Sequence, residues 1–99
     1  MRTRKQLLWW LLAGTKGGNT RILILAALAE EPQNANQLAQ RLSLDYKTVR
    51  HHLSLLSENG LVEGIGAGYA NSYFLSDLVA EERELVNGIL RRKGMEELK

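Results

Sequence analysis

The sequence predicts a mainly α-helical domain with one small β-hairpin and an extra helix at each end. Apolar residues recur with a helical period through most of the chain. Two short apolar runs flank a glycine-rich stretch at residues 66–71, which is typical of a hairpin. The 99 residues are enough for one domain. We divide them into an apolar N-terminal helix with a glycine-rich joint (1–18), a central domain (19–76) and a C-terminal helix (77–99).

The first expected helix, Lys5–Ala13, is apolar on nearly every side and must therefore be covered. Its apolar run, Leu7–Ala13, is too short to span a bilayer, which takes about 20 residues. We therefore predict no membrane span. Peripheral membrane attachment through Trp9 and Trp10 is an alternative. The tail after the last helix, from Gly94 onward, is expected to fray.

Two further helices are expected before residue 43. The first begins at a cap formed by Asn19 or Thr20 and ends near Glu30, ahead of a proline. The next one opens at Asn34, with Gln37 three residues on, a spacing that favours a capping box.

A longer helix is expected from residue 46 to about residue 59. Asp45 is a suitable N-cap, and its carboxylate favours the positive start of the helix. Val49, Leu53 and Leu56 repeat at i, i+4 and i+7 and predict one buried stripe. Gly60 suits the left-handed position after the last turn.

The remaining elements are two strands and a last helix. Leu61–Ile65 and Ser72–Leu75 are predicted to form the hairpin. Asp77 can then cap a helix from Leu78 to about Arg92.

The segment LAQRLSLDYKTVRHHLSLLSENGLV resembles the ArsR-like group of bacterial and archaeal transcription regulators. It carries that group's Leu-Ala pair, a tight turn, then T-V-x-H-H-L and N-G-L-V. Ala39 matches the small residue between the paired helices, and Ser43 replaces the usual glycine of the turn. The resemblance covers about residues 19–76 and, with residues 7–19, extends to short archaeal DNA-binding regulators. It implies a winged helix-turn-helix and a cytoplasmic, sequence-specific regulator that binds double-stranded DNA.

The outward face of the 46–59 helix is the candidate DNA-reading surface. Lys and Arg reach guanine acceptors or phosphates, and residues 1–50 hold eight Lys/Arg against three acidic residues. The alternative is a solvated helix face and a wing that only forms a turn. The predicted DNA contacts are Tyr46, Lys47, Thr48, Arg50, His51 and Ser54 on the helix, with Tyr69 and Asn71 on the wing.

The adjacent pair His51 and His52 does not predict a metal site. Neighbouring side chains on a helix point about 100° apart, so they cannot chelate one ion together. The chain has no cysteine, and its last helix has no histidine. The resemblance implies that His51 faces outward and that His52 packs at the edge of the core. We predict no metal, no cofactor and no enzymatic activity.

The two end helices are predicted to form a homodimer, because both are too apolar for free surface helices. The alternative is that both helices pack within one subunit. A rival function is a winged-helix protein–protein module of transcription or chromosome machinery, which would account for a wing loop without Lys or Arg. The predicted dimer contacts are Leu8, Trp9, Trp10 and Leu12 in the first helix, with Leu78, Leu85, Val86 and Ile89 in the last.

Overall fold

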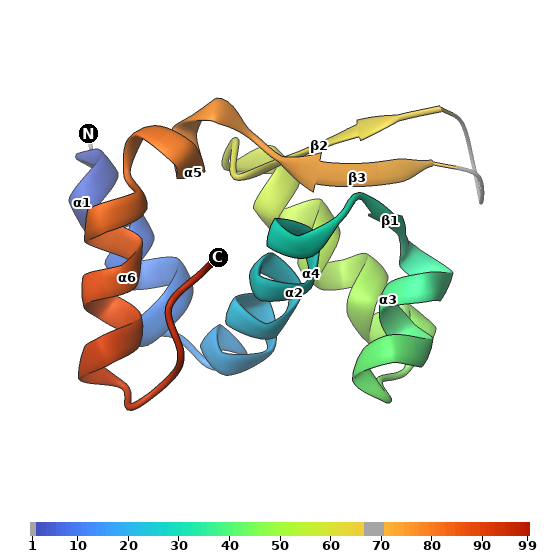
Figure 1. Ribbon diagram of the computed structural model, residues 1–99, viewed down its shortest axis with the longest axis horizontal. Helices are drawn as coiled ribbons and strands as arrows, with labels where there is room; N and C mark the ends of the chain where they lie inside the picture. The colour runs from blue at the N-terminus through green and yellow to red at the C-terminus, as the bar shows by residue number, and fades with distance from the viewer. Residues whose placement is uncertain (1, 67–70) are drawn as a thin grey trace.

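The computed structural model describes residues 2–66 and 71–99 and confirms a mainly helical chain with a small sheet (Figure 1). At one end of the molecule, α1 (Arg4–Trp9) lies beside α6 (Arg83–Arg92). Three helices fill the rest of the body: α2 (Gly18–Glu30), α3 (Ala35–Leu42) and α4 (Tyr46–Glu58). The hairpin extends along one side, above α3 and α4 in this view.

Short-range interactions fix the ends of α3 and α4 as predicted. Asn34 and Gln37 form a reciprocal capping box, with both hydrogen bonds at 2.8 Å. Asp45 caps α4 by accepting from the amides of the second and third residues of the helix, at 3.0 and 3.2 Å. Gly60 has φ +79° just after α4. Ser43 adopts φ +54° between the helices, which is the left-handed position that glycine usually takes.

The sheet has one strand more than the sequence predicted. Strands β2 (Val62–Ile65) and β3 (Ser72–Leu75) form the expected antiparallel hairpin. The two-residue strand β1 (Gln33–Asn34) pairs with the other edge of β3. No sequence pattern marks so short a strand, because its stability comes from a partner about 40 residues away. β1 connects the end of α2 to the start of α3 and so ties the helical pair to the wing.

One continuous core holds these elements together. The predicted stripe of α4, Val49, Leu53 and Leu56, is fully buried. Ala39 of α3 is also buried, and α3 packs directly against α4. The core continues into the N-terminal segment, where Leu8, Leu11 and Leu12 are inaccessible to solvent.

The chain ends depart from the predictions in three ways. The first helix continues past α1 as one wide π-helical turn, η1 (Trp10–Gly14). The last helix is interrupted at Glu82, which separates α5 (Asp77–Glu81) from α6. The tail does not fray: Leu98 is 6% exposed, and its amide donates to the Asn87 side chain at 2.8 Å. A buried apolar anchor near the last residue outweighs the entropy that usually frees a terminus.

The start of α2 was also predicted wrongly. Neither Asn19 nor Thr20 caps it; the N-cap is Gly17, with φ +90°, and no side chain of the described residues completes the cap. A Cβ at this position would lie 2.7 Å from Cε1 of His52. Glycine is required here because α2 begins directly against α4.

Candidate DNA-binding face

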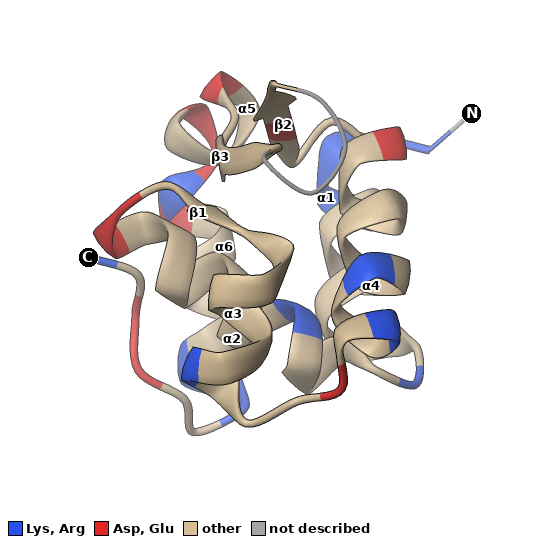
Figure 2. Cartoon of the chain, turned by 90° about the vertical axis from the view of Figure 1, so that its right-hand side faces the viewer, with Lys and Arg blue, Asp and Glu red and all other residues tan. Residues whose placement is uncertain are grey.

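The outward face of α4 presents the predicted polar residues together. Lys47, Thr48 and Arg50 are exposed, whereas the opposite side of the helix is buried in the core. Figure 2 shows basic positions along α4, with acidic positions at both ends of the helix. In the described part of the chain, neither Lys47 nor Arg50 forms an ion pair. Both cations are therefore available for acceptors outside the chain. The remaining face residues are Tyr46, which is partly buried, and His51 and Ser54, which are exposed.

The start of α4 is partly closed to anions by its own N-cap. The carboxylate of Asp45 occupies two of the free amides and places a negative charge at this end. These two amides are therefore not free to bind a phosphate near Tyr46. The cationic side chains of Lys47 and Arg50 lie on the outward face of the helix instead.

The wing adds a polar hollow rather than a basic arm. A hollow of about 370 Å³ separates α4 from the hairpin, with Ser54 and Ser57 on one side and Gly64 and Asn71 on the other. Asn71 folds back onto its own hairpin: a Cβ at Gly64 would lie 2.6 Å from its Nδ2. Its Oδ1 is buried and has no hydrogen-bond partner among residues 2–66 and 71–99. Tyr69 lies outside the described residues.

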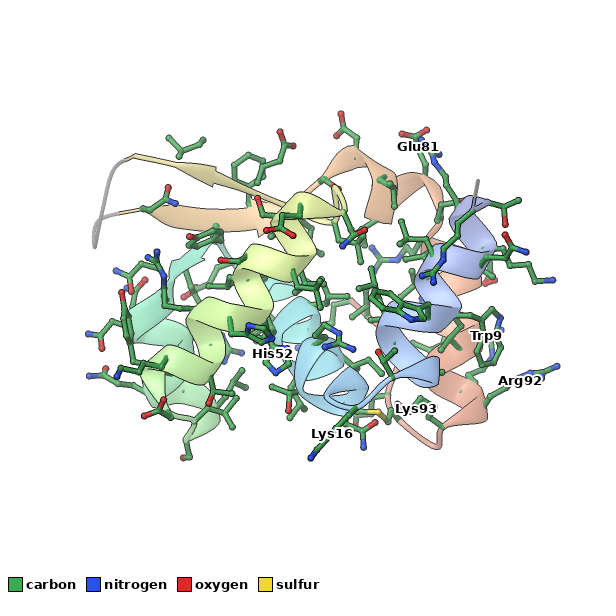
Figure 3. All side chains as sticks on the ribbon, turned by 180° about the vertical axis from the view of Figure 1, so that it is seen from behind. Trp9, Lys16, His52, Glu81, Arg92 and Lys93 are labelled. Atoms are coloured by element: carbon green, nitrogen blue, oxygen red, sulfur yellow. The ribbon has the colours of Figure 1, made fainter. Side chains whose placement is uncertain are left out.

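His51 and His52 occupy different environments, as predicted. His51 is exposed on the polar face, whereas His52 is 8% exposed and points toward α2 (Figure 3). The rings meet edge to face, with 5.4 Å between centroids. Burial lowers the pKa of His52, and the nearby charges of Arg21 and His51 lower it further. His52 is therefore neutral at neutral pH.

Arg21 is the site residue that sequence reasoning missed. It is 2% exposed, and its NH1 lies 3.2 Å from Nδ1 of His52. The sequence did hold a sign of this burial, because Arg21 shares a helical stripe with the buried Leu25 and Leu28. Its partners were not foreseeable, since they come from other elements of the chain.

The predicted dimer residues separate into two groups. Leu8, Leu12, Val86 and Ile89 lie in the core of the chain itself, with at most 1% exposed, and offer almost no surface to a partner. Trp9, Trp10, Leu78 and Leu85 are partly exposed around that core. Figure 3 shows Trp9 on α1 near Arg92 on α6, and the guanidinium carbon lies 5.8 Å from the indole centroid.

Residues 2–66 and 71–99 contain neither a cluster of metal ligands nor a helix that could span a membrane. This part of the chain contains no group of three or more His, Cys, Asp or Glu that could hold a metal ion. It also contains no helix with the length and apolar character needed to cross a membrane.

Comparisons with known proteins agree with the geometry. Residues 18–64 match the family described as bacterial regulatory protein, arsR family. The transcriptional repressor BigR from Xylella fastidiosa is 23% identical with a TM-score of 0.67, over 87% of this chain and 79% of BigR. HlyU from Vibrio cholerae N16961 is 23% identical with a TM-score of 0.65, over 92% of this chain and 94% of HlyU. No curated protein matches this chain in sequence. At these identities the solved structures establish a shared fold.

Proposed function

We propose that this chain, whose residues 18–64 match the arsR family, is a DNA-binding transcription regulator. In this proposal it binds duplex DNA as a cytoplasmic homodimer with α4 in the major groove. The amphipathic character of α4 is the observation that supports this placement. One side of the helix is sealed in the core, and the other presents Lys47 and Arg50 without ion-pair partners among the described residues. We refer to α4 below as the recognition helix.

The individual contacts follow from side-chain chemistry. Arg50 can donate two hydrogen bonds to O6 and N7 of guanine, and Lys47 can reach a guanine acceptor or a phosphate. Thr48, His51 and Ser54 present shorter donors beside them. In this proposal Asn71 is a weaker candidate than the helix residues, because its amide is folded against Gly64.

The proposed dimer uses the partly exposed surface of α1 and α6. A hollow of about 560 Å³ lies there, and its lining includes Trp9, Leu85 and Gly88. Aromatic anchors beside a shallow hollow are typical of subunit interfaces. Two copies joined through these helices would place two recognition helices on one duplex, about 34 Å apart.

The test is the salt dependence of duplex binding. We expect the wild-type protein to show a steep linear decrease of log K with log salt concentration. Changing Lys47 and Arg50 to Ala should weaken binding and, for each phosphate contact removed, reduce the slope by about one.

The matched control is the double variant R83A/K99A, which removes the same charge from the start of α6 and the tail, away from the residues that line the hollow between α1 and α6. It should keep the wild-type slope if the recognition helix carries the contacts. Equal slopes for K47A/R50A and the wild type would contradict the proposed placement of α4.

A second candidate function has one observation in its favour. Ile65, at the end of β2, is 66% exposed, and the neighbouring Glu63 is acidic. An apolar and acidic wing edge suits a protein partner better than DNA. Weak duplex binding that does not change in K47A/R50A would favour this protein–protein module.

A further inference from the structure

The carboxyl end of the first helical segment is held by donors from three parts of the chain. The last carbonyls of a helix lack intrahelical partners and carry its negative dipole end. Here Thr15 Oγ1 donates to the carbonyl of Trp10, Arg21 Nε to that of Leu11, and Lys93 Nζ to that of Leu12, each at 2.7 Å. Two cations, from α2 and from the end of α6, thus stabilise one helix end.

These carbonyls explain how Arg21 is buried without a carboxylate. Burial lowers its pKa, yet a guanidinium stays charged in proteins and must be hydrogen-bonded. Besides Leu11, it donates from NH2 to the Thr15 hydroxyl at 2.6 Å and to the Lys16 carbonyl at 3.4 Å. In the described part of the chain Arg21 forms no ion pair. The negative end of the first helix takes the place of a counter-ion.

The remaining contact of Arg21 reaches the recognition helix. A guanidinium can only donate, so Nδ1 of His52 must accept, and the imidazole proton lies on Nε2. This contact requires a neutral ring. Protonation would place an N–H against the guanidinium, and the nearest charged or titratable groups are Arg21 from α2 and His51 from α4 itself. No carboxylate in the described chain forms an ion pair with His52.

We propose that Arg21 is a positioning residue for DNA binding: it links the recognition helix, through His52, to the carboxyl end of the N-terminal helix. The inference rests on the proposed function, because α4 must contact DNA for its position to affect affinity. The same N-terminal segment carries Trp9, which lines the hollow of the proposed dimer surface. The contact between Arg21 and His52 therefore connects the proposed dimer surface to the recognition helix. This contact breaks when His52 is protonated.

Two substitutions of His52 separate this role from simple packing. His52→Asn keeps an acceptor close to the position of Nδ1 and cannot titrate. His52→Leu has the same branching as Asn but offers no acceptor. Both retain Arg21 and the exposed His51, so the comparison between variants isolates position 52.

The experiment measures fluorescence anisotropy of a labelled mixed-sequence duplex at low salt, between about pH 7.5 and about pH 5.5. We expect H52N to bind like the wild type at the higher pH. Relative to H52N, the wild type should lose affinity at the lower pH, by less than about tenfold, because the lowered pKa of His52 leaves only part of the protein protonated there. H52L should bind about tenfold more weakly than H52N at both pH values.

Identical pH profiles for the wild type and H52N would overturn the proposal. Equal affinities of H52L and H52N, with both folded by circular dichroism, would also overturn it. If H52L does not fold, the pH comparison between the wild type and H52N still tests the proposal. A wild-type protein that binds no duplex at any pH would instead overturn the proposed function, and this inference with it.

Discussion

At the scale of single residues, interactions within a few positions along the chain were predictable, and longer-range ones were not. The capping pair Asn34 and Gln37, the N-cap Asp45 and the turn residue Gly60 all act within four residues of their partners. Arg21 contacts His52, which lies 31 positions away. Its burial was readable from helical periodicity, but its partner required the packing of α2 against α4.

His52 provides the residue-scale prediction. Its pKa is lowered in the folded protein, chiefly by burial, so the unfolded chain binds a proton more readily. The contribution of neutral His52 to folding stability is therefore fully present above about pH 6.5, the ordinary pKa of histidine. This contribution decreases as the pH falls below that value. Thermal unfolding of the wild type should show a lower Tm at about pH 5.5 than at about pH 7.5.

The control for this prediction is H52N, which has no proton to take up at position 52. Its Tm should decrease less over the same pH range. A wild-type Tm that falls no more than that of H52N would show that His52 is not protonated more readily in the unfolded chain.

At the scale of elements, periodic apolar patterns predicted α2, α3, α4 and the hairpin, because each has one face in the core. The patterns could not distinguish a continuous last helix from α5 and α6, since the break at Glu82 leaves the apolar positions in register. Nor could they reveal which apolar residues of the end helices are covered within the subunit. The structure leaves part of Trp9, Trp10, Leu78 and Leu85 exposed. Of these, Trp9 and Leu85 line the hollow between α1 and α6 on which the dimer proposal depends.

The prediction at this scale concerns the outer surface of α6. Leu85 is partly exposed beside the hollow between α1 and α6, so Leu85→Lys should not disturb the core. A charge buried in a subunit interface without a partner strongly disfavours association. Light scattering should therefore report a dimer for the wild type and a monomer for L85K.

The matched control is Leu23→Lys on α2, where another leucine is 43% exposed. L23K should remain dimeric. An L85K protein that is still a dimer at the same concentration would exclude the α6 surface as the interface.

At the scale of the whole molecule, the N-terminal helix and the recognition helix form one connected unit. Arg21 and Lys93 bring α2 and α6 to the same helix end, and the buried Leu98 fixes the tail on this body. None of these contacts follows a sequence period, which explains why the sequence predicted the fold but not the links between its ends. The proposed spacing of two recognition helices depends on this rigidity.

Selection of bound duplexes from a random pool, with the wild type and R50A, tests the central claim most directly. For the wild type we expect two related half-sites about one helical turn apart, 10–10.5 base pairs between centres. R50A should keep this spacing and lose its preference at one base pair in each half-site. Identical preferences for both proteins, or no enriched sequence for the wild type, would contradict reading by the recognition helix.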